Sequence, residues 1–352
     1  MIPVLDAIST LRSFAINPLV NGLILGILVL GVFISFRVLN IADLSVEGIL
    51  PMLTMFTAVL IGDGWNPWLV LLVCMAIGAA CGVMNALLTI YLKTPPLLSG
   101  IIVMALTFGV AIMINSLKAG QASFDPETHL TVFNWLRELL ANGSTDNIWR
   151  FYASYLSYIL VAAVILAAVW FVLYFFFGTE LGMSIRAAGK NPTMSRANGI
   201  SVNAMSIVAL AISGGLIGLA SSLYGQHNCY GLPTDGQGLI VIALSSLFLG
   251  EIIFGQRSFK IAMISAVVGS LIYWYIIQAL MLLDNQGYML SIYKALLLVV
   301  ILAIQWGITK FRKAHPRKPK PDQGGSGVNS RGEGQSLRQS IIRHCLGDRT
   351  VC

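Results

Sequence analysis

TELGMSIRAAGKNPTMSRANG, residues 179–199, is a polar island between two long apolar segments of the chain. Leu181, Ile185 and Ala188 recur in it at helical spacing, which predicts a short helix that turns these side chains toward the rest of the protein. Gly189 stands where a left-handed residue would cap the C-terminal end of such a helix. In so apolar a chain, a polar island of this kind belongs at the membrane surface.

The second half of the island predicts another short helix. Asn191 is an N-cap residue, and Pro192 suits the first helical position, where its missing N–H costs no hydrogen bond. Asn198 and Gly199 are typical of the end of a helix. The island therefore predicts a compact, cationic helix pair. An ordinary loop is the alternative, because caps and glycines occur wherever helices end.

Composition places the chain among multi-spanning membrane proteins. Hydrophobic residues make up 57% of its 352 residues and charged residues only 11%, and the mean hydropathy is +0.80. The N-terminus lacks a basic region and a small-residue cleavage site, so its first apolar stretch is expected to be a retained span. We expect an all-α, multi-pass protein of the cell membrane.

Apolar windows long enough to cross a hydrocarbon core about 30 Å thick predict eight or nine crossings. The window 44–62 is the weakest, because Gly48 and Pro51 would break it, and it could be bent or re-entrant. The windows cover residues 17–38, 44–62, 67–92, 96–117, 155–177, 203–224, 237–254, 260–282 and 288–311.

The distribution of charge predicts the orientation. If the island faces the cytoplasm, most basic residues outside the spans lie on its side, as the positive-inside rule requires; they are Arg37, Lys93, Arg257, Lys260 and the basic tail. The other side collects acidic residues, and nine crossings would place the N-terminus there. The domain division is then a transmembrane region over 1–312, with an external loop at 118–154, and a disordered, basic and glycine-rich cytoplasmic tail over 313–352.

The order of motifs after residue 178 resembles the permease subunits of ABC importers of the branched-chain amino acid and ribose type. In that family a G-x-x-x-R-A-x-G-x-N-x-x-x-A-x-x-x-G-I loop precedes a span of small residues, a P-x-x-G turn and a glycine-containing segment. One departure is Glu251, which stands where the family often has a second glycine. The matching residues are Gly182, Arg186, Ala187, Gly189, Asn191, Gly199, Ile200, Pro233, Gly236, Leu249, Gly250 and Gly255.

This resemblance implies a permease driven by a separate ATPase. The island would be a coupling loop, residues 179–203, that docks on an ABC ATPase dimer; the ATPase, not this chain, would use ATP and magnesium. It also implies a second permease copy and an extracytoplasmic substrate-binding protein, with no nucleic acid as partner. The expected docking residues are Gly182, Arg186, Gly189, Asn191, Pro192, Arg196 and Gly199.

Missing motifs narrow the function further. The chain has no G-x-x-x-x-G-K-[ST] phosphate loop and no H-E-x-x-H or G-x-S-x-G motif, so we expect neither ATP hydrolysis nor another catalytic activity, and no bound cofactor or metal. Charged residues are absent from the middles of the predicted spans, which disfavours a proton-coupled carrier. An ATP-independent carrier or channel remains the alternative to an importer of a small solute such as an amino acid.

Polar residues in or beside the spans are candidates for the translocation pathway. The alternative for Asp43, Ser45 and Glu47 is a purely structural role, as the start of a helix with an acidic first turn. The uncharged ones could equally hold neighbouring helices together. The candidates are Asp43, Ser45, Glu47, Asn85, Asn115 and Ser213.

Overall fold

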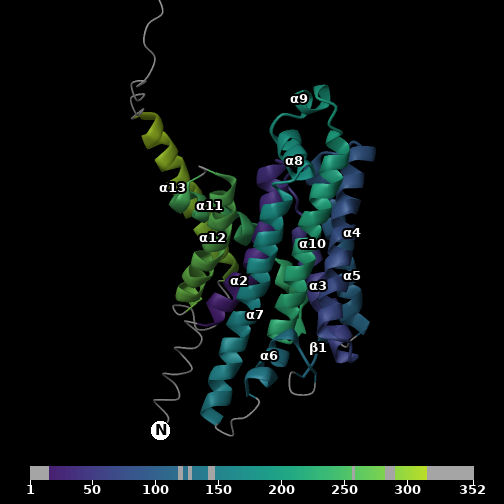
Figure 1. Ribbon diagram of the computed structural model, residues 1–352, viewed down its shortest axis with the longest axis vertical. Coiled ribbons are helices and arrows are strands. Elements are labelled where there is room, and N and C mark those ends of the chain that lie inside the picture. The colour runs from purple at the N-terminus through teal and green to yellow at the C-terminus, as the bar shows by residue number, and fades with distance from the viewer. Residues whose placement is uncertain are drawn as a thin grey trace, which may run out of the picture. The chain divides into compact units, whose positions relative to one another are not determined.

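The computed structural model describes residues 16–117, 122–125, 129–141, 147–255, 258–281 and 290–314, and Figure 1 shows their arrangement. The described part is almost entirely helical. Its α-helices are α2 (Asn17–Val32), α3 (Val46–Gly62), α4 (Pro67–Tyr91), α5 (Pro96–Leu117), α6 (Val132–Ala141), α7 (Asn147–Phe176), α8 (Glu180–Lys190), α9 (Pro192–Ala197), α10 (Val202–Asn228), α11 (Leu239–Phe254), α12 (Phe259–Met281) and α13 (Leu290–Ala314). The π-helix η1 (Phe33–Val38) extends α2, and the 3-10 helix η2 (Pro233–Gly236) precedes α11. Two short strands, β1 (Ala122–Ser123) and β2 (Tyr230–Gly231), pair antiparallel.

The chain separates into two units, residues 1–307 and 308–352, and the fold below is that of the first. The second unit is described only as the last turns of α13, so the predicted tail from residue 315 onward lies outside the described residues. The same holds for most of the predicted external loop, in which residues 118–121, 126–128 and 142–146 are not described.

The all-α membrane fold is confirmed. Seven described helices are long and apolar enough to cross a membrane, and α3 and the segment Ile292–Gly307 are two shorter apolar helices. Together they match the nine windows predicted from hydropathy. Many of their large apolar side chains, such as Leu72, Val164 and Val299, are exposed on the outside, as expected for helices that face lipid.

Helix α2 is the centre of the unit. In its membrane-crossing segment, which includes η1, 83% of the residues are buried, more than in any other described span. The Ser213 hydroxyl of α10 donates to the Gly31 carbonyl at 2.8 Å, and the Ser270 hydroxyl of α12 donates to the Gly22 carbonyl at 3.0 Å. The two flanking helices are thus bonded directly to the backbone of α2.

Small residues let α4 and α10 touch along their backbones. A Cβ atom on Gly78 would overlap the Gly214 carbonyl oxygen, and one on Gly218 would overlap the Cys74 carbonyl oxygen. Close approach of this kind is how small-x-x-x-small pairs hold helices together in lipid. The Gly78/Gly82 and Gly214/Gly218 pairs therefore pack these two helices together.

Two long helices are each followed by a break in the helical backbone and then by a short apolar helix. After η1, Asn40 is left-handed with φ of 60°, and α3 begins at Val46; after α10, Cys229 is left-handed with φ of 62°, and α11 begins at Leu239. We call residues 39–45 the first break and residues 229–238 the second break. The helices α3 and α11 have only 17 and 16 residues, about 25 Å of helical rise each.

Helix α3 is not re-entrant, although the sequence left this open. The chain leaves η1 at Val38, which touches Gly189 of α8, and α3 ends at Gly62, whose missing Cβ would lie 3.9 Å from Phe124 near strand β1. Residues 39–62 together therefore pass from one end of the unit to the other. Helix α3 also continues through Pro51 without interruption. Pro51 has no N–H to bond the Glu47 carbonyl one turn earlier, and Gly236 packs against both residues.

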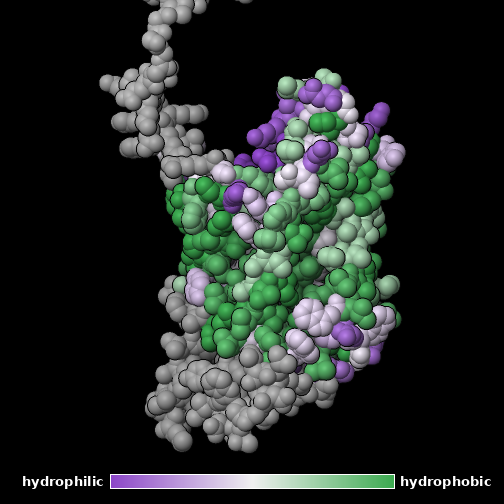
Figure 2. Space-filling view, in the orientation of Figure 1, coloured by the Kyte–Doolittle hydropathy of each residue, from purple (hydrophilic) through white to green (hydrophobic). Residues whose placement is uncertain are grey.

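The two ends of the unit carry different charges, as the sequence predicted. Arg37, Arg186, Lys190 and Lys260 line one pocket at the end formed by α8 and α9. Asp63 and Asp125 line another pocket of about 360 Å³ with Phe124 and His129. Figure 2 shows apolar side chains over the visible middle of the molecule and hydrophilic ones gathered over α8 and α9.

Helix α6 lies at the end opposite to α8 and α9 (Figure 1). Helical spacing predicts that Val132, Trp135 and Leu139 share one face of this helix, as in an interfacial or docking helix. Val132 is fully buried, while 49% of Trp135 is exposed and its ring lies 6.2 Å from that of Trp68. The side chain of Leu139 is outside the described set.

Candidate functional site

The second helix of the island forms as predicted. The Asn191 side chain accepts a hydrogen bond from the Met194 N–H at 3.1 Å, and Pro192 occupies the first turn of α9. At the other end Gly199 is left-handed, with φ of 78°. Its N–H donates to the Arg196 carbonyl, and the Ile200 N–H donates to the Ser195 carbonyl, both at 3.0 Å. This is a Schellman motif, which fixes where α9 stops.

The first helix of the island differs from the prediction in two ways. Gly189 is not a left-handed cap but an internal residue of α8, which continues to Lys190. It must be small because a Cβ there would overlap the Val38 carbonyl oxygen at the end of η1. Leu181 is 53% exposed, and the side of α8 that faces the protein carries Gly182, Ile185 and Ala188 instead.

Glycines pin α8 against the transmembrane helices. Gly182 is buried, and a Cβ on it would overlap the Phe176 carbonyl oxygen at the end of α7. With Gly189 against Val38, both halves of α8 touch backbone of the membrane-spanning part. A displacement of α8 would therefore be transmitted to α7 and η1, because no flexible side chain separates them.

The outward side of α8 and α9 is exposed and partly apolar. Met183 is 53% and Met194 63% exposed. Exposed Arg196 accompanies them. The sequence analysis missed both methionines, since the apolar spacing singled out only the inner face. A flexible apolar knob beside a positive charge is suited to contact with another protein.

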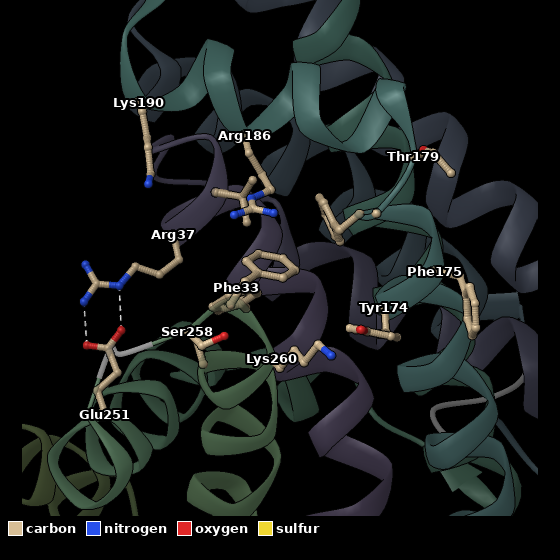
Figure 3. A pocket seen from close by; sticks show the side chains of 15 residues that line it. Phe33, Arg37, Tyr174, Phe175, Thr179, Arg186, Lys190, Glu251, Ser258 and Lys260 are labelled. Carbon is tan, nitrogen blue, oxygen red and sulfur yellow. Dashed lines mark hydrogen bonds and ion pairs between the residues drawn. The ribbon is translucent and has the colours of Figure 1, made fainter.

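A pocket of about 920 Å³ lies on the inner side of α8 (Figure 3). Its basic side chains come from three elements: Arg37 from η1, Arg186 and Lys190 from α8, and Lys260 from α12. The Arg186 guanidinium lies 4.5 Å from the centre of the Phe259 ring. Arg186, which the sequence placed among the docking residues, is thus directed into this pocket.

Glu251 is the acidic residue of the same pocket. Its carboxylate accepts hydrogen bonds from Arg37 Nε at 2.5 Å and from an Arg37 terminal nitrogen at 2.6 Å, a bidentate pair drawn as dashed lines in Figure 3. The Glu251 side chain is 5% exposed and that of Arg37 34%. The departure from the family pattern thus has a structural reason, since this glutamate joins α11 to the end of η1.

Three of the pathway candidates meet in the first break. The Asp43 carboxylate accepts from the Ser45 N–H at 2.9 Å and from the Asn85 amide at 2.8 Å. All three residues are buried, with exposed fractions of 3%, 0% and 1%. Asn85 lies six residues before the end of α4, about 9 Å by helical rise. The cluster is therefore inside the unit, where it holds the first break against α4.

Glu47 joins the two short helices that follow the breaks. Its carboxylate accepts from the Ile240 N–H, in the first turn of α11, at 3.3 Å. A Cβ on Gly236 would overlap the Glu47 carbonyl oxygen, so the second break also touches the first turn of α3. The N-termini of α3 and α11 thus face one place, where the negative charge of Glu47 is favourable to both helix dipoles.

The remaining two candidates lie apart from these. Ser213 is a packing residue, because its hydroxyl bonds to α2 as described above. Asn115, near the end of α5, has a buried side-chain oxygen without a hydrogen-bond partner among the described residues.

Lys294 of α13 is a charged residue near Glu47 that the sequence analysis did not predict, because it lies near the end of an apolar window. It interacts electrostatically with Asp235 and Glu47.

Comparisons with known proteins give one consistent result. The family model of the branched-chain amino acid transport system permease component matches residues 14–305. A tyrosine transport system permease protein of Clostridioides difficile is 27% identical over 83% of this chain and 91% of its own length. The ribose import permease RbsC of Escherichia coli K12 is 24% identical, over 74% and 75%. The guanosine ABC transporter permease NupQ of Bacillus subtilis is 28% identical, over 60% and 67%. No solved structure matches the chain.

Proposed function

The chain belongs to the family of permease components of branched-chain amino acid transport systems, and from this membership we propose that it is the membrane subunit of an ATP-driven importer of an amino acid. It is an integral membrane protein and an ABC transporter permease. Permeases of this kind are not themselves enzymes, so the energy for transport comes from a separate ATPase. A second copy of this chain and an extracytoplasmic binding protein complete the proposed complex.

The observation that carries this proposal is the outward surface of α8 and α9. Two capped helices present Met183 and Met194 at the polar end of the unit, while Gly182 and Gly189 hold the inner side against α7 and η1. An ATPase that bound the methionines would be mechanically connected to the spans through backbone contacts. Closure of an ATPase dimer would then move η1, and with it the first break.

The first break is the element through which such movement would reach a solute. Asp43 and Asn85 hold it to α4, and Glu47 holds it to the start of α11. Irregular backbone inside a membrane protein occurs where it is buried in protein or lines a cavity. A displacement of η1 would shift this segment between its two attachments, which supplies the alternating access that import requires.

The amino-acid substrate rests on the similarity to the tyrosine transport permease, which extends over nearly the whole of both chains. The ribose and guanosine permeases are also similar, so sugars and nucleosides are the competing substrates. Radiolabelled tyrosine, ribose and guanosine, each offered alone and in competition, distinguish these three. We expect uptake of the amino acid to exceed that of the other two at least tenfold.

The test is reconstitution in liposomes with the candidate ATPase and binding protein, following ATP hydrolysis and uptake together. The variant Met183→Asp/Met194→Asp places two charges on the outward surface, which a docked ATPase would have to desolvate. Its control is Leu130→Asp, because the Leu130 side chain is also about half exposed, at 51%, but does not belong to α8 or α9. We expect the double variant to lose ATPase co-purification and uptake at least tenfold, while Leu130→Asp retains co-purification.

Two results would count against the proposal. Uptake by this chain alone, insensitive to ATP, would make it a carrier or channel. Unchanged co-purification of the double variant with the ATPase would show that the methionine surface is not the docking site.

A further inference from the structure

The pocket on the inner side of α8 has a strong excess of positive charge. Four basic side chains and one carboxylate line it, and the carboxylate of Glu251 is paired with Arg37. Among the described residues, no carboxylate lies within ion-pair distance of Arg186, Lys190 or Lys260. Three cations in a concave site without paired acids favour an anionic ligand.

Aromatic rings form the rest of the wall. The Lys260 ammonium lies 4.6 Å from the centre of the Tyr174 ring, and the Arg186 guanidinium stands over Phe259. Phe33, which lies 5.7 Å from Phe259, adds to the apolar floor. Such cation–π contacts hold a basic group in place and leave its N–H donors directed elsewhere. The cations are thus positioned without an acid that would have to be displaced.

The pocket lies at the level where the spans leave the hydrocarbon. The apolar segment Leu156–Phe176 ends at its wall, and the segment Phe259–Met281 begins there. On α7 beside the pocket, Phe175 is 58% exposed and Val172 64%, so an apolar surface extends from the cavity along the helix. A ligand that is anionic at one end and apolar at the other satisfies both parts.

We propose that this pocket binds the headgroup of an anionic phospholipid from the leaflet on the α8 side, with Arg186, Lys190 and Lys260 around the phosphate and the acyl chains along α7. Basic pockets between transmembrane helices at the cytoplasmic surface have the chemistry for such headgroups. The volume of about 920 Å³ lies near the upper end of the range for small-molecule sites, about 300–1,000 Å³. It therefore accommodates a headgroup together with the start of its chains.

The site is tested by native mass spectrometry of the delipidated full-length protein, titrated with phosphatidylglycerol or with phosphatidylcholine of the same acyl chains. We expect one phosphatidylglycerol to be retained per chain, with at least a fivefold preference over phosphatidylcholine. Arg186→Gln/Lys260→Gln should weaken retention roughly twentyfold, because each charge near the membrane surface contributes about fivefold in affinity. Equal retention of the two lipids would overturn the proposal.

A matched control keeps the same change of charge at the same end of the molecule. Lys93→Gln/Arg196→Gln removes two exposed cations that do not line the pocket, and its retention of phosphatidylglycerol should stay within twofold of the parent protein. If loss of the contact between Arg186 and the Phe259 ring prevents folding, Lys190→Gln provides a second test, because Lys190 is exposed and its replacement should not affect folding. This variant should weaken retention of phosphatidylglycerol about fivefold. An equal loss in the control and pocket variants would overturn the proposal.

Two further arms distinguish other sources of negative charge. Excess inorganic phosphate should leave the lipid bound, because it lacks the acyl chains; complete displacement by phosphate would assign the pocket to a free anion. The lipid should also remain bound when the candidate ATPase is added. Its release by the ATPase would assign the pocket to an acidic surface of that partner.

Discussion

The two breaks have the same backbone arrangement but are held in place by different side-chain contacts. In each, a long helix stops at a left-handed residue, Asn40 or Cys229, and a short apolar helix starts a few residues later. The first break is anchored by Asp43, which is 3% exposed and bonded to another helix. The second contains Asp235, which is half-buried and accepts the Leu232 N–H at 2.9 Å, within its own turn.

This difference shows which break is fixed to the helices around it. Asp43 connects the first break to α4, so the first break moves either together with α4 or by breaking a buried bond. The bond made by Asp235 shapes only the local turn. The second break contacts the rest through Gly231 and Gly236, which lie against α3, and through the pairing of β2 with β1, and none of its side chains hydrogen-bonds to a helix other than the adjoining α10 in the described part of the chain. In the proposed transport cycle, the second break is therefore the easier one to displace.

Removal of the buried acceptor should give the largest effect. Asp43→Leu leaves the Ser45 N–H and the Asn85 amide without their acceptor, and each unsatisfied buried donor costs about 1–3 kcal/mol. We expect a loss of about 2–4 kcal/mol in the free energy of unfolding, measured by thermal unfolding in detergent with Asp43→Asn as control. Asn keeps one carbonyl acceptor in place, so an Asn variant as unstable as the Leu variant would show that charge, not the hydrogen bonds, matters.

Separation of the second break from the start of α3 should have an intermediate effect on stability. In Gly236→Ala the new methyl group overlaps the Glu47 carbonyl oxygen and lies 2.8 Å from Pro51 Cδ. Such overpacking costs about 1–3 kcal/mol. Gly109→Ala is the matched control, because nothing lies within 4 Å of its Cβ position and alanine favours the helix. Equal melting temperatures for the two variants would show that the second break does not touch the start of α3.

The features that depend on nearby residues could be predicted from the sequence. Long apolar runs identified the nine apolar helices found among the described residues, since the length needed to cross a bilayer is a local property. The start of α9 at Asn191 and Pro192 and its end at Gly199 were also predictable, because a cap is formed by residues within one turn.

The features that depend on distant residues could not be predicted. Gly189 is needed because of Val38, and the choice of Glu251 over glycine is explained by Arg37. Helical spacing found an apolar face on α8, but Leu181 is exposed because the close contact at Gly182 sets which side faces the spans. The pocket is likewise invisible in the sequence, since its cations come from three separate elements.

The smallest effect is expected in the second break itself. Asp235→Leu removes the acceptor of the Leu232 N–H, and a helix cap lost from a partly exposed turn costs about 1 kcal/mol. Thr234→Val, at an exposed position of the same turn, should change the free energy of unfolding by less than about 0.5 kcal/mol. Both are compared by thermal unfolding with Asp43→Leu in one series. If Asp235→Leu destabilised the protein as much as Asp43→Leu, the second break would be as firmly anchored as the first. The assignment of the second break as the more easily displaced segment would then be wrong.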